Sequence, residues 1–309
     1  MIVYSMLFVT LLTAFASLRT VWRASARYLG DSWPALLLGL ATGWFIYLYG
    51  TWVYLSVYLK YVFAALVFLT LFIGMTRNKQ DHRKPGAGKK AANISGASLL
   101  ILLCILYYTG INGKPRTVAL QFPLKTGKYF ILQGGKGLPA NLFHYSYRGA
   151  IYAIDIARLD ERGNRAKKIF SNRLEDYHIF NDTVYSPCAG RIVNVRNDNP
   201  DNIPPHRERG PSNLNAVLIE TDSFYVFMGH FRKGSVIVSE GQTVRAGQAL
   251  AQVGNSGMSL EPHLHIQAHT KKPGQSWYSG APLYIEFDGK TYLLFQTIRP
   301  KNVSMIGGK

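Results

Sequence analysis

A chain of 309 residues is long enough for a domain of ordinary size together with a second region. Its net charge of +18 at pH 7 favours an anionic surface or polymer as a partner. Its two cysteines are too few for a disulfide-rich scaffold or a four-cysteine zinc site, so both classes are excluded.

The amino-terminal third of the chain contains long segments without any charged residue. They cover residues 1–18, 32–59, 61–76 and 91–113. A bilayer core requires about 20 apolar residues for each helix, and these segments have that size. The block from Trp33 to Met75 is long enough for two helices, with a turn expected near Gly50 and Thr51. The first segment has neither a positively charged start nor a small-residue cleavage site, which indicates a retained helix and not a signal peptide. We therefore predict a four-helix transmembrane region over residues 1–112.

The basic residues next to these segments predict the orientation of the helices, because loops rich in lysine and arginine stay in the cytoplasm. These residues are Arg19, Arg23, Arg27, Arg77, Lys79, Arg83, Lys84, Lys89 and Lys90. The amino terminus and everything after about Asn112 are therefore expected outside the cytoplasm. Lys60 lies part-way into the expected third helix, and its side chain is expected to extend toward the nearer interface.

Residues 113–309 have the sequence pattern of an all-β domain. Short segments rich in Val, Ile, Tyr and Phe, such as KYFILQ, IYAIDIA and NAVLIET, alternate with Gly, Pro, Asn and Asp. Residues 158–182 and 198–213 are polar and irregular, and the proline-rich second stretch is expected to be an exposed loop. From residue 112 on, 25 basic residues stand against 15 acidic ones, a net charge of +10. Outside the cytoplasm this charge fits anionic lipid or a cell-wall polymer, and nucleic acid is not an expected partner.

The segment from Gly234 to Gly254 has a glycine-punctuated alternation that predicts tight hairpins in a small barrel or sandwich. Lipoyl and biotinyl carrier domains share this pattern and carry a modified lysine at a hairpin tip. No lysine lies between Lys233 and Lys271, which disfavours a carrier domain.

The segment EPHLHIQAH, residues 261–269, holds three of the eight histidines of the chain. Side chains alternate between the two faces of a strand, so His263, His265 and His269 are expected on the same face. One interpretation is a solvated strand face. The other is a metal site.

Further residues elsewhere in the chain favour the metal site. Zinc catalysis requires about three protein ligands and an open position for water, with imidazole and carboxylate as suitable donors. Asp155 lies in the strand-like segment YAIDIA, His230 ends the aromatic segment FYVFMGHF, and His144 lies in NLFHYSYRG. These three residues are candidate partners of the histidine row.

The order of these residues and motifs is similar to that of a known enzyme family. His144, Asp155, TVYSPCAGRIV, FYVFMGHF and GNSGMSLEPHLHI follow one another in an order that resembles the lysostaphin and LytM-type zinc metallopeptidases. These are extracytoplasmic enzymes that cut peptide cross-bridges or stems of bacterial peptidoglycan. The resemblance covers about Gln121 to Ala268 and leaves the membrane region uncovered. It implies an all-β zinc peptidase domain over residues 113–309, a small β-sandwich or barrel with an antiparallel sheet.

The resemblance also implies a role for each candidate residue. Asp155 and His265 match two of the family's Zn²⁺ ligands, and His144 is the expected third. His263 and His230 match the catalytic histidines that do not bind the metal. In the implied mechanism, one of these two accepts a proton from the zinc-activated water and hydrogen-bonds the developing oxyanion.

This chain departs from the family's commonest pattern at one position. That pattern has the first histidine four residues before the aspartate, where this chain has Ile151. A subset of the family places the histidine further upstream on a loop after an asparagine, as in ANLFH, which ends at His144 here.

Other residues near the histidine row are expected to support the site. Asn255 and Ser256 are expected to shape the turn before the strand, and Ser259 and Glu261 to line a substrate groove. His269 is expected to be structural or to support a metal ligand through a hydrogen bond.

The function implied by the resemblance is hydrolysis of peptide bonds in peptidoglycan by a zinc metalloendopeptidase. The domain is expected on the periplasmic or cell-wall side of a bacterial cytoplasmic membrane, with a wall peptide as substrate and a membrane protein as a possible partner. One alternative is a catalytically inactive LytM-like domain that binds cell wall or regulates a partner hydrolase. Another is a membrane signalling or scaffold protein whose β domain is a sensor.

Overall fold

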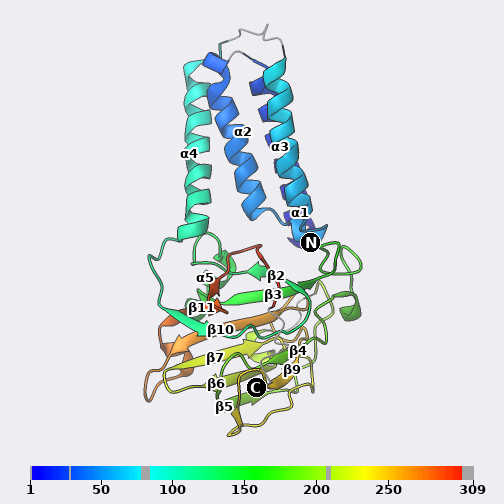
Figure 1. Cartoon of the computed structure of the whole chain (residues 1–309), viewed down its shortest axis with the longest axis vertical. Helices are drawn as coiled ribbons and strands as arrows, with labels where there is room; N and C mark the ends of the chain where they lie inside the picture. The colour runs from blue at the N-terminus through cyan, green and yellow to red at the C-terminus, as the bar shows by residue number, and fades with distance from the viewer. Residues whose placement is uncertain (1, 28, 78–83, 207–209, 301–309) are drawn as a thin grey trace, which may run out of the picture. The chain divides into compact units, whose positions relative to one another are not determined.

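The computed structural model describes residues 2–27, 29–77, 84–206 and 210–300. The chain divides into two compact units, Met1–Thr109 and Gly110–Lys309. The first unit is helical and the second is built on a large β-sheet (Figure 1). An antiparallel β domain preceded by long apolar helices is the fold class expected from the sequence, and it is confirmed.

Four helices in the described part of the first unit are long and apolar enough to cross a membrane. They are α1 (Ile2–Ser25), α2 (Leu29–Tyr49), α3 (Leu59–Thr76) and α4 (Ala87–Thr109), with a short 3-10 helix, η1 (Trp52–Tyr54), after α2. Large apolar side chains on these helices are exposed, for example Phe8 at 66% and Phe68 at 71%. Such a surface is suited to lipid and not to water.

Small residues allow α1 and α2 to pack closely. A Cβ atom at Gly39 would lie 3.0 Å from Val21, and one at Gly43 would lie 3.0 Å from the hydroxyl of Ser17. That hydroxyl donates a hydrogen bond to the carbonyl of Gly39 at 2.8 Å. Close backbone approach of this kind is typical of helices that associate within a membrane. α2 ends at the residue before Gly50, where the turn was expected.

Two helices extend into basic residues beyond the charge-free segments that predicted them. α1 contains Arg19 and Arg23, and α4 contains Lys89, although these residues were expected in loops. Lys60 is the second residue of α3, and so lies at the start of this helix, not part-way along it. The physical reason is that lysine and arginine are good helix formers, so a helix continues past the end of an apolar segment.

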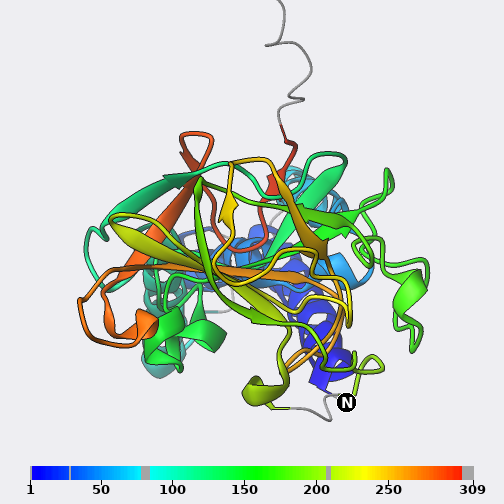
Figure 2. The ribbon, with the colours of Figure 1, turned by 90° about the horizontal axis from the view of Figure 1, so that it is seen from below.

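In the described part of the second unit, an 11-stranded sheet has the order β13-β2-β3-β10-β7-β6-β5-β8, with β11 paired to β10 and β1 and β12 paired to β11. The strands of this sheet are β1 (Thr117–Leu120), β2 (Lys128–Gln133), β3 (Ile154–Leu159), β5 (Gly190–Arg196), β6 (Ala216–Glu220), β7 (Phe224–Gly229), β8 (Thr243–Val244), β10 (Leu264–Thr270), β11 (Pro282–Phe287), β12 (Lys290–Thr291) and β13 (Thr297–Ile298). All pairings in it are antiparallel except that of β1 with β11. Seen from below, the strands fan out because the sheet is twisted (Figure 2).

A two-stranded sheet and short helical segments complete the unit. The small sheet consists of β4 (Thr183–Tyr185) and β9 (Ala249–Gln252). The helical segments are α5 (Leu142–Tyr145), η2 (Arg148–Ala150), η3 (Leu174–Asp176), η4 (Pro211–Asn213) and η5 (Trp277–Ser279).

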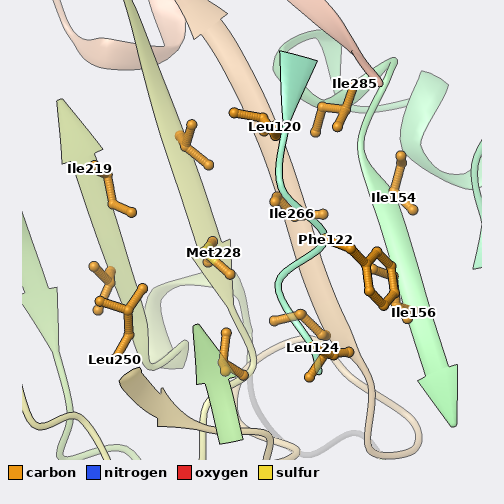
Figure 3. Packing of buried hydrophobic residues seen from close by; sticks show 14 of the residues in the cluster. Leu120, Phe122, Leu124, Ile154, Ile156, Ile219, Met228, Leu250, Ile266 and Ile285 are labelled. Carbon is orange, nitrogen blue, oxygen red and sulfur yellow. The ribbon is translucent and has the colours of Figure 1, made fainter. Parts of the chain in front are cut away.

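The apolar core lies on one face of the large sheet and includes side chains of the small one. Figure 3 shows part of this cluster; its labelled members are Leu120, Phe122, Leu124, Ile154, Ile156, Ile219, Met228, Leu250, Ile266 and Ile285. Full burial of one such side chain contributes about 1.5–3 kcal/mol. Ile154 and Ile156 of β3 and Ile266 of β10 face this core, so the residues between them face the opposite side of the sheet.

The stretch 198–213, expected to be an exposed loop, is exposed only in part. Asn202 is 1% exposed, and its side-chain amide donates hydrogen bonds to the carbonyls of Gly257 at 2.6 Å and Ser259 at 3.1 Å. Proline excludes a central strand here but does not exclude burial of a side chain that finds hydrogen-bond acceptors. Residues 207–209 of this stretch lie outside the described residues.

Candidate metal centre

The pairing of β3 with β10 places an aspartate directly opposite a histidine. In this antiparallel pair His265 lies opposite Asp155, and the next pair, Leu264 opposite Ile156, is fully buried in the core. A shift of one residue would turn these apolar side chains out of the core, so core packing determines the register. Nδ1 of His265 is consequently 2.9 Å from Oδ1 of Asp155.

His144 reaches the same aspartate from α5. Its Nε2 lies 3.2 Å from Oδ2 of Asp155. Asn141 orients the imidazole: its Oδ1 accepts a hydrogen bond from Nδ1–H of His144 at 3.1 Å, and its Nδ2 donates to the carbonyls of Ile151 at 3.2 Å and Ala153 at 2.9 Å. Ile151, at the position of the family's commonest histidine, thus contributes only a backbone carbonyl.

Three of the predicted residues form one cluster. Single ligand atoms of His144, Asp155 and His265 all lie within 4.8 Å of one another, and all three residues are buried. Two imidazoles and a carboxylate are donors that zinc binds, and three protein ligands leave a position for water. Nδ1–H of His144 donates to Asn141, and Nε2–H of His265 donates to Gln267 at 3.0 Å. These hydrogen bonds direct Nε2 of His144 and Nδ1 of His265 into the cluster. The residues present therefore fit a zinc ion.

Gln267 connects this cluster to a second buried histidine on β10. Its side-chain nitrogen lies 3.4 Å from Nε2 of His269, whose Nδ1–H donates to the carbonyl of Gly280 at 3.2 Å. His269 is 0% exposed. Burial lowers the pKa of His269, although hydrogen bonds to the carbonyls of Gly280 and Gly149 oppose the change. The polar face of β10 is therefore buried and hydrogen-bonded, which excludes the interpretation as a solvated strand face.

The other two candidate histidines lie beside the cluster. The ring centroids of His230 and His263 are 4.4 Å apart, and Nε2 of His263 is 3.6 Å from Oδ1 of Asp155. Nδ1–H of His230 donates to the carbonyl of Ser256 at 2.7 Å, and Nδ1–H of His263 donates to the carbonyl of Glu261 at 2.8 Å. With Nδ1 acting as the donor, each neutral ring has a lone pair on Nε2.

Burial and neighbouring charges determine the protonation of the site. Burial would raise the pKa of Asp155, but the charges of His144 and His263 and hydrogen bonds from His144 and His265 hold it well below its usual value. Burial, with the charges of His263 and His265, lowers the pKa of His230 well below 6.5. Burial opposes protonation of His265, but its hydrogen bond to Asp155 raises the pKa of the imidazole. At pH 7 the site therefore combines an ionised carboxylate with a neutral His230.

Buried polar side chains fix the loop before β10. Asn255 and Ser256 are both 0% exposed. The Asn255 amide donates to the carbonyl of Asn202 at 2.9 Å, and the Ser256 hydroxyl donates to that of Phe231 at 2.8 Å. His230, which has a left-handed backbone with φ 64°, is held in this conformation by the same loop.

Ser259 and Glu261 do not line an open groove, contrary to the expectation. They are 1% and 8% exposed. The carboxylate of Glu261 forms a buried ion pair with Arg165, whose Nε lies 2.8 and 2.9 Å from its two oxygens. Arg165 belongs to the irregular stretch 158–182, and the two residues are 96 positions apart, so no local sequence signal indicated the pair.

The comparison with protein families concerns the same part of the chain. Residues 175–276 match the model of peptidase family M23. The chain contains an M23 peptidase domain. The resemblance to lysostaphin-like enzymes is thereby confirmed. The matched residues include His230, His263 and His265, whereas His144 and Asp155 of the cluster precede the match.

Solved structures similar to this chain include three from different bacteria. A catalytic-domain variant of the prophage-encoded M23 protein EnpA from Enterococcus faecalis is 19% identical, with a TM-score of 0.32, and covers 52% of this chain and 93% of that chain. The catalytic domain of the antimicrobial peptidase lysostaphin from Staphylococcus simulans is 17% identical, with a TM-score of 0.27, and covers 50% and 85%. A zinc-containing peptidase from Vibrio cholerae is 22% identical, with a TM-score of 0.23, and covers 38% and 46%. No curated protein matches the chain.

Proposed function

We propose that this chain is a membrane-anchored zinc metalloendopeptidase that hydrolyses peptide bonds in peptidoglycan. The observation that carries the proposal is the convergence of His144, Asp155 and His265 within 4.8 Å of one another, beside His230 and His263. The match to peptidase family M23 supports the same reaction class.

The proposed roles follow from the hydrogen bonds of each side chain. His144, Asp155 and His265 would hold a zinc ion, which when bound supplies an activated water and polarises the scissile carbonyl. His230 and His263 offer Nε2 as proton acceptor, because Nδ1–H of each ring is held by a backbone carbonyl. The ring that accepts the proton becomes an N–H donor, so it stabilises the developing oxyanion and then protonates the leaving amine.

The helical unit supports an anchoring role. Four apolar helices have the length of membrane spans. Basic residues lie at the C-terminal end of α1 and the N-terminal end of α4, which favours a cytoplasmic location for these two ends. The β domain is then extracytoplasmic, where peptidoglycan is found. Only residues 110–116 separate α4 from β1, and such a connector reaches at most about 25 Å. The proposed substrate is therefore wall material close to the membrane.

Zinc analysis and digestion of purified sacculi by the full chain test this function. We expect about one zinc ion per chain in the wild type and release of new peptide ends detected by mass spectrometry. Asp155→Asn and His265→Ala should lose zinc, with activity falling by about a thousandfold or more. His206→Ala removes an exposed histidine outside the cluster and should retain both properties.

The same experiment decides between the proposal and a non-catalytic wall-binding domain. The complete His/Asp/His donor set supports the enzyme. Zinc-loaded wild type that binds sacculi but releases no peptide ends would contradict the hydrolase and favour the wall-binding alternative.

A further inference from the structure

A polar hollow lies at one end of the helical unit, outside the M23 domain. It has a volume of about 300 Å³ and is lined by residues of α1, α2 and α4 and the segments next to them, where α1 ends and the other two helices begin. Its charged lining consists of four basic residues and one acidic residue, which are Arg19, Arg23, Arg27, Lys89 and Asp31. A net positive hollow of this size suggests an anionic ligand.

The basic side chains converge because of their spacing. Arg19 and Arg23 are four residues apart in α1, which places them on one side of the helix, and Arg27 follows two residues after the helix ends. Like charges at this spacing destabilise a helix, so a counter-charge in the hollow would be stabilising. The carboxylate of Asp31 lies 3.5 Å from the ammonium group of Lys90, so part of its charge is already compensated there.

The uncharged part of the lining is of two kinds. Thr20, Ser32 and Asn93 carry hydrogen-bonding groups. Ala24, Pro34, Ala35, Leu38 and Pro85 are apolar. A site for a free anion needs the polar groups only, whereas an amphiphile with a charged head and an apolar tail matches both.

The depth of the hollow agrees with a lipid headgroup. The charge-free part of α1 ends at the residue before Arg19. At 1.5 Å per residue this part, residues 2–18, extends about 26 Å, close to the thickness of about 30 Å of a hydrocarbon core. If α1 spans a bilayer as proposed above, the hollow lies at headgroup level on the cytoplasmic face. Basic pockets between membrane helices on this face bind anionic headgroups.

We propose that this hollow binds the phosphate-bearing headgroup of an anionic phospholipid from the cytoplasmic leaflet. The guanidinium groups of Arg19 and Arg23 bind phosphate oxygens, and the apolar residues contact the first part of the acyl chains. A volume of about 300 Å³ is at the lower end of the range for small-molecule sites, which suits a headgroup and not a whole lipid. This inference rests on the proposed membrane anchoring and is independent of the peptidase reaction.

Native mass spectrometry of the full chain in detergent micelles tests the ligand class. Phosphatidylglycerol, phosphatidylcholine and inorganic phosphate are added separately and then in competition. We expect phosphatidylglycerol to bind about tenfold more tightly than phosphatidylcholine, and inorganic phosphate not to displace it. Equal affinity for the two lipids, or displacement by inorganic phosphate, overturns the proposal, the second result in favour of a free-anion site.

Arg23→Gln tests the site itself, with Lys84→Gln as the matched control. Both changes remove one positive charge near the same helix ends, but Lys84 is exposed and does not line the hollow. We expect about tenfold weaker binding of phosphatidylglycerol by Arg23→Gln, partial recovery in Arg23→Lys, and no change in Lys84→Gln. Lys89→Gln should weaken binding in the same way and replaces the first variant if that one does not fold. Equal losses in the test and control variants overturn a specific site.

Two further measurements separate this inference from the proposed function. A chain recovered from cells in the soluble fraction and not in membranes overturns both the anchoring and the lipid site. Sacculus digestion by Arg23→Gln should equal that of the wild type, because Arg23 lies outside the M23 domain. A wild type without peptidase activity that still selects phosphatidylglycerol contradicts the enzyme and leaves the lipid site intact.

Discussion

At the scale of single residues, the hydrogen-bond acceptor next to each imidazole determines which ring nitrogen faces the cluster. Nδ1–H of His144 and Nε2–H of His265 donate to side-chain oxygens. Nε2 of His144 and Nδ1 of His265 therefore face Asp155. His230 and His263 donate to backbone carbonyls and keep a lone pair on Nε2. The proposed division into metal-binding and proton-accepting histidines thus follows from neighbouring acceptors.

Gln267 should contribute to zinc affinity without touching the metal. Gln267→Leu removes the acceptor of Nε2–H of His265, so this ring loses its fixed orientation. We expect zinc to bind about 10–100-fold more weakly, measured by competition with a chromophoric chelator. Gln267→Glu keeps an acceptor and should retain most of the affinity. Gln275→Leu, at an exposed position, serves as the control, and an equal loss there would contradict this role.

His230 should make the stability of the metal-free protein depend on pH. A histidine in the unfolded chain has a pKa near 6.5, whereas burial lowers the pKa of folded His230 well below this value. Between these two pKa values the unfolded chain binds more protons, so this contribution to stability is complete above about pH 6.5 and is lost as the pH falls. We expect a smaller decrease of Tm between about pH 7.5 and about pH 5.5 in His230→Asn than in the wild type.

Asparagine is the substitution of choice because it tolerates the left-handed backbone of His230, which has φ 64°. His206→Asn, at an exposed position, should leave the pH dependence unchanged. Identical slopes in wild type and His230→Asn would show that the imidazole of His230 is not held neutral by burial.

At the scale of elements, the site depends on how loops are attached to the central strands. β3 and β10 supply Asp155 and His265 through their register, but the loop before β10 is held by side chains of distant segments. Asn202 and Arg165 are such side chains, and both come from stretches that the sequence indicated only as irregular or exposed. Buried polar residues in loops therefore determine the positions of His230 and His263.

The buried ion pair of Arg165 with Glu261 should be costly to break from one side. Arg165→Met leaves a buried carboxylate without its partner, and we expect a loss of about 3–5 kcal/mol in the free energy of unfolding. Combining it with Glu261→Met should recover most of this loss, because an apolar pair has no desolvated charge. Thermal unfolding of single and double variants measures the difference.

Arg173→Met is a matched control for this experiment. Arg173 lies 3.9 Å from Glu175, and the two side chains are 68% and 61% exposed. An exposed pair contributes at most about 1 kcal/mol, so this variant should unfold close to the wild type. Equal effects of Arg165→Met and Arg173→Met would contradict a structural role for the buried pair.

At the scale of the whole molecule, the chain joins two units with different surfaces. The helical unit exposes large apolar side chains such as Phe15 and Phe72 along its helices, whereas the β unit buries a large apolar cluster. The first pattern is suited to lipid and the second to water. In the proposed topology, the charge pattern puts the M23 domain on the side of the membrane opposite the basic ends of α1 and α4.

Labelling of introduced cysteines should show this orientation. In a Cys188→Ser background, Gln275→Cys should react with a membrane-impermeant maleimide on intact spheroplasts, because it lies in an exposed loop of the β unit. Lys84→Cys should react only after permeabilisation. The remaining native thiol, Cys104, is 0% exposed and provides the unlabelled background. The reverse labelling pattern would contradict the proposed topology.

Much of the architecture follows from patterns within short segments. Apolar length predicted the four helices, and alternation with turn residues predicted the β domain. The boundaries of α1 and α4 differed, because basic residues extend helices beyond the apolar segment. Strand parity predicted that His265 and His269 share a face but not that this face is buried, which depends on what the rest of the chain packs against it.

The sequence by itself determined the two kinds of unit and the residue types able to bind zinc, because hydropathy and period are properties of neighbouring residues. Only the tertiary structure decided that His265 meets Asp155 across 110 positions, that Arg165 pairs with Glu261, and that arginines of α1 and a lysine of α4 line one hollow. Such contacts between distant residues depend on strand register and helix packing. Register and packing are determined by the burial of a whole core and not by any one segment.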